Sequence, residues 1–306
     1  MQYWVAMSKW VVLVQHNLLN KILGNHKMKT IISKITATAL ALGIGFGSTA
    51  ALAAGGPKNK PREVDWSFSG PFGKWDLGQL QRGYKIYAEV CASCHSIELL
   101  SFRNLQEIGF SEEEVKAIAA EFEVTDGPNA DGEMFERPAV AADKIPGPYA
   151  NTAEGAALNN GAAPPDFSLL AKARAPERGF PTFVFDIFTT YAENGSDYIY
   201  SLLTGYKDAP EGVELAEGTH YNPYYIGGEA LAMGQPLYGD DVEYDDGTEP
   251  TLDQHAKDVT AFMTWAAEPY LIERKQLGFK VIIFLLILSV LLYLSKKQVF
   301  AGMKKD

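Results

Sequence analysis

The pentapeptide Cys91-Ala-Ser-Cys94-His95 restricts the possible folds of this chain more than any other feature of its 306 residues. The spacing C-x-x-C-H is the attachment signature of c-type haem. Two thiols about one helical turn apart can add to the two vinyl groups of a porphyrin, and the adjacent histidine then lies under the iron. The motif therefore predicts one covalent haem c, attached through Cys91 and Cys94, with His95 as an iron ligand.

Three other interpretations of the two cysteines account for less of the sequence. A thioredoxin-like redox pair needs a strand–helix setting, and none precedes Cys91. A zinc site needs further ligands, and after residue 53 the only other histidines are His220 and His255. A structural disulfide would explain neither His95 nor the helical run before it. The chain has no other cysteines than Cys91 and Cys94, so the haem interpretation is favoured.

The second iron ligand is sought among the methionines that follow residue 53, which are Met134, Met233, Met263 and Met303. Met303 lies beyond the apolar C-terminal segment. Met263 belongs to segment 253–267, in which apolar residues repeat at helical spacing, so its side chain is expected in the core. Met134 lies in a charged loop, residues 131–137, which offers it little apolar support.

Met233 remains, in a strap of residues 227–237 that is punctuated by Gly and Pro and precedes the helical segment 253–267. A helix before C-x-x-C-H, a methionine strap and a closing helix follow the order of small mono-haem cytochromes. Met233 is therefore the predicted axial ligand, with a core-filling methionine as the alternative. His/Met coordination leaves no open site on the iron and raises its potential, which suits electron transfer better than oxygen or peroxide chemistry.

The N-terminal region has the layout of a secretory signal peptide. Within residues 28–53 two lysines precede a short apolar stretch, and a small-residue exit ends at Ala53, which predicts cleavage before Ala54. A first transmembrane helix is the alternative, but the apolar stretch is short and rich in glycine. Residues 1–27 precede this layout, which suggests that translation starts at Met28.

The other end carries an apolar segment, residues 277–294, whose eighteen residues would span about 27 Å as a helix. A buried core helix is the alternative. The segment is apolar all round, and Lys280 near its end can extend its ammonium group to the interface, so one membrane anchor is predicted. Residues 54–276 are then the exported haem domain and residues 295–306 the tail on the other side.

Charge narrows the choice of partners. The formal net charge of the chain is −11. Residues 1–53 hold five lysines and no acidic residue, so without them the charge is −16; the tail holds four lysines and one aspartate, and without it the body carries −19. An exported domain with this negative charge is not expected to bind nucleic acid or anionic lipid. Its charge favours a basic partner. Segment 240–246 is especially acidic, so it is a candidate for the surface on which this partner docks. A solvated loop is the alternative.

Several longer stretches resemble one family. They are RGYKIY at 82–87, LSFRNL at 100–105, DGPNADGEMFERP at 126–138, NNGAAPPDFS at 159–168, YIYSLLTG at 198–205, YNPYY at 221–225 and DDGT at 245–248. From about Asp65 to the tail, the chain resembles the cytochrome c1 family, the haem subunits of the ubiquinol:cytochrome c oxidoreductase (bc1 complex), in a bacterial version. These stretches are far more specific than the haem motif alone.

The resemblance implies further residues around the haem. It implies that Arg174 pairs with a haem propionate, for which a planar guanidinium is well suited. It also places five residues at the haem edge, which are Asn159, Ala162, Pro164, Pro165 and Tyr198. A carbonyl of one of the two prolines is expected to accept the ring N–H of His95 and so fix its tautomer. A solvent-facing side chain is the alternative for Arg174.

One segment departs from the family pattern. The connection of residues 176–197 is longer than in mitochondrial relatives; bacterial relatives resemble it, but this one has no cysteines to staple it. Its many aromatic residues suggest that it packs on the body of the protein or on a partner.

The sequence therefore predicts a mostly α-helical, cytochrome-c-like mono-haem domain with long loops and one C-terminal transmembrane helix. The resemblance implies a bacterial plasma-membrane protein with its haem domain on the periplasmic side and its C-terminus in the cytoplasm. It implies cytochrome b and a Rieske iron–sulfur protein as partners in the complex, and a soluble basic cytochrome c as electron acceptor. The chain alone would do no bond chemistry. A haem subunit of another respiratory oxidase, or a haem-based sensor, is the alternative.

Overall fold

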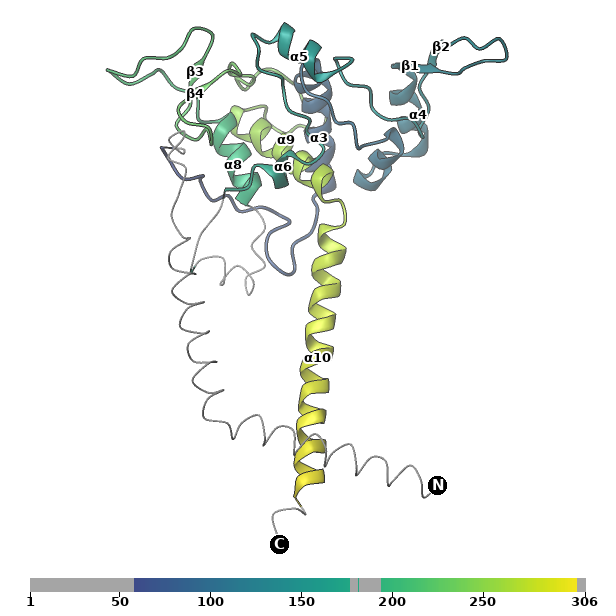
Figure 1. The fold of residues 1–306 in the computed structure, drawn as a ribbon, viewed down its shortest axis with the longest axis vertical. Coiled ribbons are helices and arrows are strands. Elements are labelled where there is room, and N and C mark those ends of the chain that lie inside the picture. Colours follow the sequence, from purple (N-terminus) through teal and green to yellow (C-terminus); the bar gives the residue numbers. More distant parts are fainter. Residues whose placement is uncertain (1–57, 177–180, 182–193, 302–306) are drawn as a thin grey trace, which may run out of the picture. The chain divides into compact units, whose positions relative to one another are not determined.

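The computed structural model describes residues 58–176, 181 and 194–301 (Figure 1). The predicted signal peptide and most of the aromatic-rich connection 176–197 lie outside these residues. The described helices are α3 (Leu77–Glu89), α4 (Glu112–Ala120), α5 (Thr152–Leu158), α6 (Leu170–Ala173), α8 (Asn194–Leu203), α9 (Leu252–Ala267) and α10 (Leu271–Phe300). Two 3₁₀ helices, η1 (Cys91–Ser93) and η2 (Phe102–Ile108), complete the helical part. The prediction of a mostly helical chain with long loops is confirmed.

Strands are short in the part of the chain that the structure describes. β1 (Glu123–Asp126) pairs antiparallel with β2 (Phe135–Pro138), with Glu123 opposite Pro138. β3 (His220–Tyr221) pairs antiparallel with β4 (Ala230–Leu231). The charged loop that holds Met134 joins β1 to β2, and the methionine strap runs on from β4.

The core of the domain is built on α3 and α9, which pack against each other, while α6 and α8 also pack on α9 (Figure 1). Asp76 caps α3, since its carboxylate accepts a hydrogen bond from the amide of Gln79 at 3.1 Å. The buried side of α3 presents Leu80, Tyr84 and Tyr87 at helical spacing. Helix α9 begins after Thr251, one residue before the predicted start at 253, and is buried along nearly all of its length.

The two helices approach each other closely at one glycine. A Cβ atom on Gly83 would lie 2.1 Å from the carbonyl oxygen of Asp258, so only glycine fits there. Beside this contact the fully buried carboxylate of Asp258 accepts a hydrogen bond from Nε of Arg82 at 2.8 Å. Gln79 and Gln254 also donate to this carboxylate. The buried charge is thus paired and hydrogen-bonded, which offsets its desolvation.

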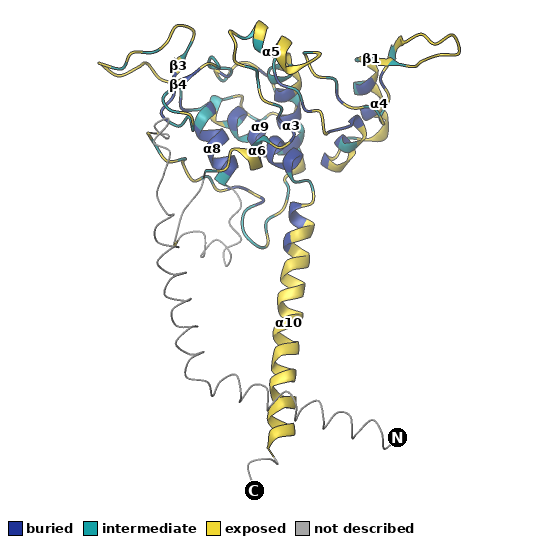
Figure 2. Cartoon of the chain, in the orientation of Figure 1, coloured by how far each residue is buried: buried dark blue, intermediate teal, exposed yellow. Residues whose placement is uncertain are grey.

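Helix α10 is continuous over thirty residues, longer than the predicted span of 277–294. Its first turn belongs to the domain, because Leu271, Ile272 and Lys275 are buried. From Gln276 onward all of its described residues are exposed (Figure 2). The helix is long and apolar enough to cross a membrane. Its exposure contradicts the alternative of a buried core helix.

Candidate functional site

The two cysteines lie in a tight turn at the end of α3. Helix α3 ends at Glu89, and η1 follows at Cys91–Ser93. The amides of Cys94 and His95 both donate to the carbonyl oxygen of Cys91, at 3.1 and 2.8 Å. This turn brings the two thiols and the histidine into one compact group. Both cysteines are free and half-buried.

The state of the cysteine thiols argues against a thioredoxin-like role. Burial, and to a smaller extent the nearby Cys94, raises the pKa of the Cys91 thiol to about 12. A catalytic or redox-active cysteine needs a lowered pKa, because the thiolate is the nucleophile. Within the described residues, no group of three or more His, Cys, Asp or Glu side chains is arranged to hold a metal ion. The two cysteines therefore suit covalent attachment of a prosthetic group better than thiol–disulfide exchange.

His95 is fixed in one orientation. Its side chain is buried, with 9% of the residue exposed, and its Nδ1 lies 2.8 Å from the carbonyl oxygen of Pro165. A carbonyl oxygen can only accept, so Nδ1 carries the proton and Nε2 keeps a free lone pair. Burial lowers the pKa of His95, which keeps the imidazole neutral at pH 7. The prediction that a proline carbonyl accepts the ring N–H of His95 is confirmed, with Pro165 as the residue.

The segment that carries Pro165 is itself held in place by Asp166. Its carboxylate accepts hydrogen bonds of 2.8 Å from Oγ of Ser96, from the amide of Glu98 and from the amide of Ser168. Partial burial would raise the pKa of Asp166, but these hydrogen bonds lower it overall. The carboxylate therefore ties the residues after His95 to the residues after Pro165.

Two aromatic side chains complete the surroundings of His95. The ring of Phe167 stacks on the imidazole, with centroids 4.3 Å apart and planes at 27°. The hydroxyl of Tyr87 donates to the carbonyl oxygen of His95 at 3.2 Å. Neither residue was predicted for the site, and neither was Asp166. All three fall inside or beside stretches that resemble the cytochrome c1 family, and this resemblance is the feature of the sequence that could have indicated them.

The other predicted ligand, Met233, lies in the strap after β4 and contacts His95. The hydroxyl of Tyr206 donates to the carbonyl oxygen of Met233 at 3.0 Å, and Met233 is half-buried against the core. Tyr206 was not predicted for the site. The strap thus brings a thioether beside an imidazole 138 positions earlier in the sequence.

The two rejected methionines lie where the sequence predicted. Met263 is buried in α9 as part of the core. Met134 is 60% exposed between β1 and β2. Both environments are those that the sequence predicted for these two methionines, and the choice of Met233 as a ligand stays a prediction.

The residues that the resemblance placed around the haem have mixed environments. Tyr198 is buried on α8, its hydroxyl accepts from the amide of Ile226 at 3.3 Å, and burial raises its pKa. Arg174 is exposed after α6, and its positive charge opposes part of this rise in the pKa of Tyr198. The side-chain amide of Asn159 donates to Tyr149 and to the carbonyl of Gly155, at the end of α5.

The last two of these residues, Ala162 and Pro164, precede the Pro165 carbonyl in the chain, Ala162 exposed and Pro164 half-buried. Arg174 is exposed, and its contact with a haem propionate stays a prediction.

The donor set fits a c-type haem. Two unpaired thiols lie one turn apart, and the neighbouring histidine presents Nε2 because Pro165 occupies Nδ1. A thioether lies in contact with that histidine from a separate segment. Two thiols, one imidazole and one thioether are the groups that covalent attachment and His/Met ligation require.

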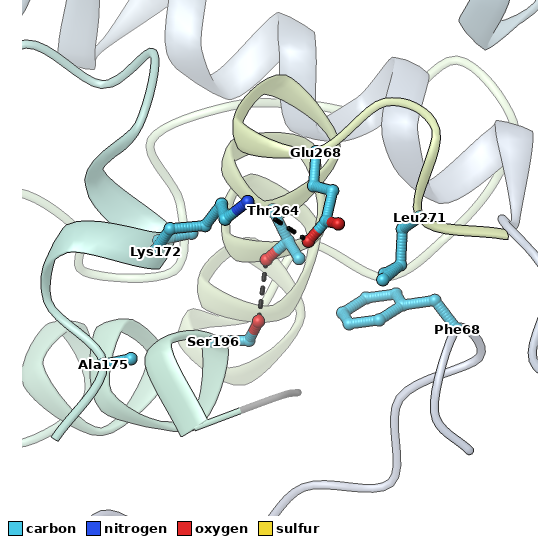
Figure 3. A pocket seen from close by; sticks show the side chains of 8 residues that line it. Phe68, Lys172, Ala175, Ser196, Thr264, Glu268 and Leu271 are labelled. Carbon is cyan, nitrogen blue, oxygen red and sulfur yellow. Dashed lines mark hydrogen bonds and ion pairs between the residues drawn. The ribbon is translucent and has the colours of Figure 1, made fainter. Parts of the chain in front are cut away.

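A cavity of about 190 Å³ lies elsewhere, beside the start of α10 (Figure 3). Phe68 and Leu271 line one side of it, and Lys172 and Glu268 form an ion pair at 3.6 Å across it. None of the predicted haem-binding residues lines this cavity, so it is not part of the site around His95.

Comparisons with known proteins agree with the sequence resemblance. A model described as the Cytochrome C1 family matches residues 66–303. A protein named cytochrome c1 from Blastochloris viridis is 43% identical over 275 residues, which is 89% of this chain and 96% of that protein. One of the same name from Rhodospirillum rubrum is 42% identical over 294 residues, covering 90% of this chain and all of that protein.

A longer relative, named cytochrome b/c1, comes from Bradyrhizobium diazoefficiens. It is 47% identical over 277 residues, which is 89% of this chain but only 40% of that protein. The chain therefore spans less than half the length of this relative, and nearly the whole length of the other two.

Proposed function

The chain belongs to the cytochrome c1 family, the electron-transfer haem subunits of the bc1 complex, and on this premise we propose that it takes electrons from a Rieske iron–sulfur protein and passes them to a soluble cytochrome c. The observation that carries this proposal is the arrangement at His95, which Pro165 holds by Nδ1 and which Met233 contacts. An iron held by both of these side chains would offer little access to other ligands, which favours electron relay.

The haem that the family implies would supply a one-electron iron couple when bound. We propose that Cys91 and Cys94 hold it covalently, and that His95 and Met233 are its axial ligands. The Pro165 carbonyl keeps the proton on Nδ1, which would leave the lone pair of Nε2 available to bind the iron. Arg174, Tyr198, Asn159, Ala162, Pro164 and Pro165 are proposed to surround the porphyrin edge, as the family resemblance implies.

Burial of the site is expected to stabilise this arrangement. Phe167 covers one face of the imidazole, and His95 is almost inaccessible to water. Exclusion of water from a metal site lowers the local dielectric and restricts small ligands. The described residues around His95 would therefore fix the geometry of the site and exclude water from it.

Membrane attachment is proposed through α10. The exposed apolar part of this helix supports a single span, with the haem domain on the periplasmic side of a bacterial plasma membrane and the C-terminus in the cytoplasm. The orientation rests on the signal-peptide pattern of residues 28–53, with cleavage proposed before Ala54. Cytochrome b is proposed as the neighbour of the span, because one relative is named cytochrome b/c1.

The docking face for a basic carrier is proposed to include segment 240–246. Some of its acidic residues are bonded within the chain, whereas others are available to a partner. Asp246 pairs with Arg82 at 2.7 Å and Asp245 with Lys85 at 3.1 Å. The carboxylate of Asp241 accepts from the amides of Tyr238 and Gly239. These three carboxylates stabilise the loop, so most of the uncompensated charge falls on Asp240 and Glu243.

A haem subunit of another respiratory oxidase remains the second candidate, and a haem-based sensor the third. The family match favours the bc1 complex over a terminal oxidase. A sensor needs an iron position that opens, whereas Met233 already lies against His95.

The test is quinol-dependent reduction of an added basic cytochrome c by membranes that carry the affinity-tagged chain. Changing both Cys91 and Cys94 to Ser should abolish it, and Met134→Leu, at an exposed position, should leave it unchanged. Cytochrome b and a Rieske protein should copurify with the parent chain. Full activity in the double serine variant, or purification without either partner, would contradict the proposal.

A further inference from the structure

A short loop beside α10 presents an unusually exposed phenylalanine. The loop, here called the Phe72 loop, comprises residues 69–74 with the sequence Ser-Gly-Pro-Phe-Gly-Lys. Phe72 is 72% exposed, which is the highest value among the large hydrophobic side chains that the structure describes. A single exposed apolar side chain is common on protein surfaces, so the role of Phe72 has to be argued from the residues that lie beside it.

The loop is built so that Phe72 stays at its tip. The amide of Ser69 donates to the carbonyl of Trp66 at 2.9 Å, and the amide of Lys74 donates to the carbonyl of Ser67 at 2.8 Å. A Cβ atom on Gly73 would lie 2.3 Å from the carbonyl carbon of Phe68, so the turn requires glycine. Behind the loop, the buried ring of Phe68 stacks on Trp66 with centroids 5.4 Å apart.

Two contacts fix the level of this loop along α10. The ring of Phe72 meets the ring of Phe279 edge to face, with centroids 5.3 Å apart. One turn earlier on the helix, Nζ of Lys275 donates to the carbonyl oxygen of Phe68 at 2.8 Å. Phe279 precedes Val281, the start of the uninterrupted apolar run, by two residues, or about 3 Å along a helix. The tip of the loop therefore lies where the apolar span begins.

The charges at this level match a membrane interface. Segment 67–75 holds no acidic residue, and α10 holds none after Glu273. Lys74, two residues after Phe72, and Lys280, directly after Phe279, are both exposed. Aromatic and long cationic side chains are typical of the boundary between bilayer and water, where the ring enters the lipid and the ammonium group reaches phosphate. This edge differs from the rest of the acidic body.

From these contacts we propose that the Phe72 loop is a second membrane contact of this protein, which inserts Phe72 into the lipid interface beside α10. The partner is lipid. The inference rests on the proposed membrane span of α10, since the loop takes its level from that helix. With two points of contact, the haem domain cannot rotate freely about the single helix, so its height and tilt above the bilayer are set.

The test places a nitroxide spin label at Phe72→Cys in the full-length holoprotein. Cys91 and Cys94 are consumed by haem attachment, so the introduced thiol is the reactive one, and the parent chain serves as the labelling blank. The protein is placed in nanodiscs of phosphatidylethanolamine and phosphatidylglycerol. Collisions of the label with oxygen, which enters bilayers, are compared with collisions with a water-soluble nickel chelate. Leu286→Cys reports the span, and Met134→Cys, in the charged β1–β2 loop, reports water.

We expect the ratio of oxygen to nickel collisions at position 72 to be at least about threefold higher than at position 134, because an apolar gas partitions into the bilayer. A ratio at position 72 equal to that at 134, with Leu286→Cys reading as lipid-buried, would overturn the loop contact and leave the span intact. A water-like reading at position 286 would overturn the span and the loop contact together.

The same label in the assembled complex distinguishes lipid from protein. Retention of the high oxygen ratio supports lipid contact. Immobilisation of the label, with loss of collisions with both reagents, would show that another subunit covers Phe72 and would overturn the proposal.

Discussion

The tautomer of His95 decides what the site can bind. Because Nδ1 donates to Pro165, Nε2 is the only ring nitrogen available to a metal, and the stacked ring of Phe167 keeps the imidazole from turning. The motif C-x-x-C-H predicted the histidine, and family resemblance predicted a proline carbonyl. Phe167 and Asp166 were not predicted for this role, because they reach His95 from about seventy positions away through tertiary packing.

Replacement of the proposed thioether ligand tests the second axial position. In Met233→Leu the haem should stay covalently attached, since the thioethers at Cys91 and Cys94 do not involve Met233. The reduction potential should fall by on the order of 0.1 V or more, because axial ligands set haem potentials over about 0.8 V. A redox titration of the holoprotein measures this change.

Met263→Leu is the matched control for that substitution. Met263 is buried in α9, and a change of similar volume in a core costs less than about 1.5 kcal/mol of stability. Its reduction potential should stay at the parent value. A lowered potential in the Met263 variant, with the Met233 variant unchanged, would show that the ligand was assigned to the wrong methionine.

Asp166 makes the support of His95 dependent on pH. Hydrogen bonds lower its pKa in the folded protein below the ordinary value of 3.8. A carboxylate with a lowered pKa stabilises the fold above its unfolded pKa, and this contribution is lost as pH falls through the folded pKa. In Asp166→Asn the Tm should therefore be lower than in the parent at pH 6, and the difference should shrink as the pH falls below 3.8.

Thermal unfolding of the holoprotein between pH 2 and 7 measures that difference. A hydrogen bond to a charged group contributes about 1.5–3 kcal/mol, so the loss at neutral pH should be easily resolved. A Tm difference that stays the same over the whole pH range would mean that the Asp166 charge does not support the Pro165 segment.

Among the elements, α3 and α9 form the frame that positions the C-x-x-C-H turn. The sequence predicted a helix before C-x-x-C-H and, from the helical spacing of its apolar residues, a second helix at 253–267. The capping of α9 by Thr251 is seen only in the structure. The sequence did not predict how closely the two helices pack, since that depends on Gly83 meeting the backbone of Asp258. A pattern along one helix carries no information on which glycine faces a partner.

Gly83→Ala tests this close approach. The added methyl group would force α9 away from α3, and overpacking of this kind costs about 1–3 kcal/mol. Gly78→Ala on the same helix is the control, because the nearest atom to its Cβ would be 3.5 Å away. That variant should keep or raise the stability, by up to about 1 kcal/mol. Denaturant unfolding of the two holoproteins measures the difference, and equal stabilities would contradict the packing argument.

Helix α10 shows a different limit of sequence reasoning. The apolar run predicted residues 277–294, whereas the helix begins at Leu271 and ends at Phe300. Hydropathy detects only the part that lipid would surround. The first turn is set by the domain, through the buried residues Leu271 and Ile272 and through the bond from Lys275 to Phe68.

At the scale of the whole molecule, charge distinguishes the proposed docking surface for a soluble partner from the proposed membrane-facing edge. The body is strongly acidic, while the Phe72 loop and the start of the span are locally basic. Composition predicted the overall sign. It did not predict which acidic residues of segment 240–246 are already paired within the chain, because Arg82 and Lys85 approach that segment only in the folded protein.

Reversing the charge of Asp240 and Glu243 to Lys should slow electron transfer to a basic cytochrome c several-fold at low salt and flatten the salt dependence of its rate. Opposite charges steer association, and salt screens them over about 10 Å at 0.1 M. Stopped-flow kinetics over a range of ionic strength measures this. The same reversal at Asp131 and Glu133, in the β1–β2 loop, controls for net charge. Equal effects of both reversals would place the docking face elsewhere.

The central claim is that this protein holds a closed, His/Met-ligated haem whose role is to carry electrons. The carbon monoxide difference spectrum of the dithionite-reduced holoprotein tests it most directly, with Met233→Leu as the variant that opens the iron. We predict almost no spectral response in the parent and a full response in the variant. A parent protein that binds carbon monoxide as completely as the variant would contradict the claim, because its iron would have an open position.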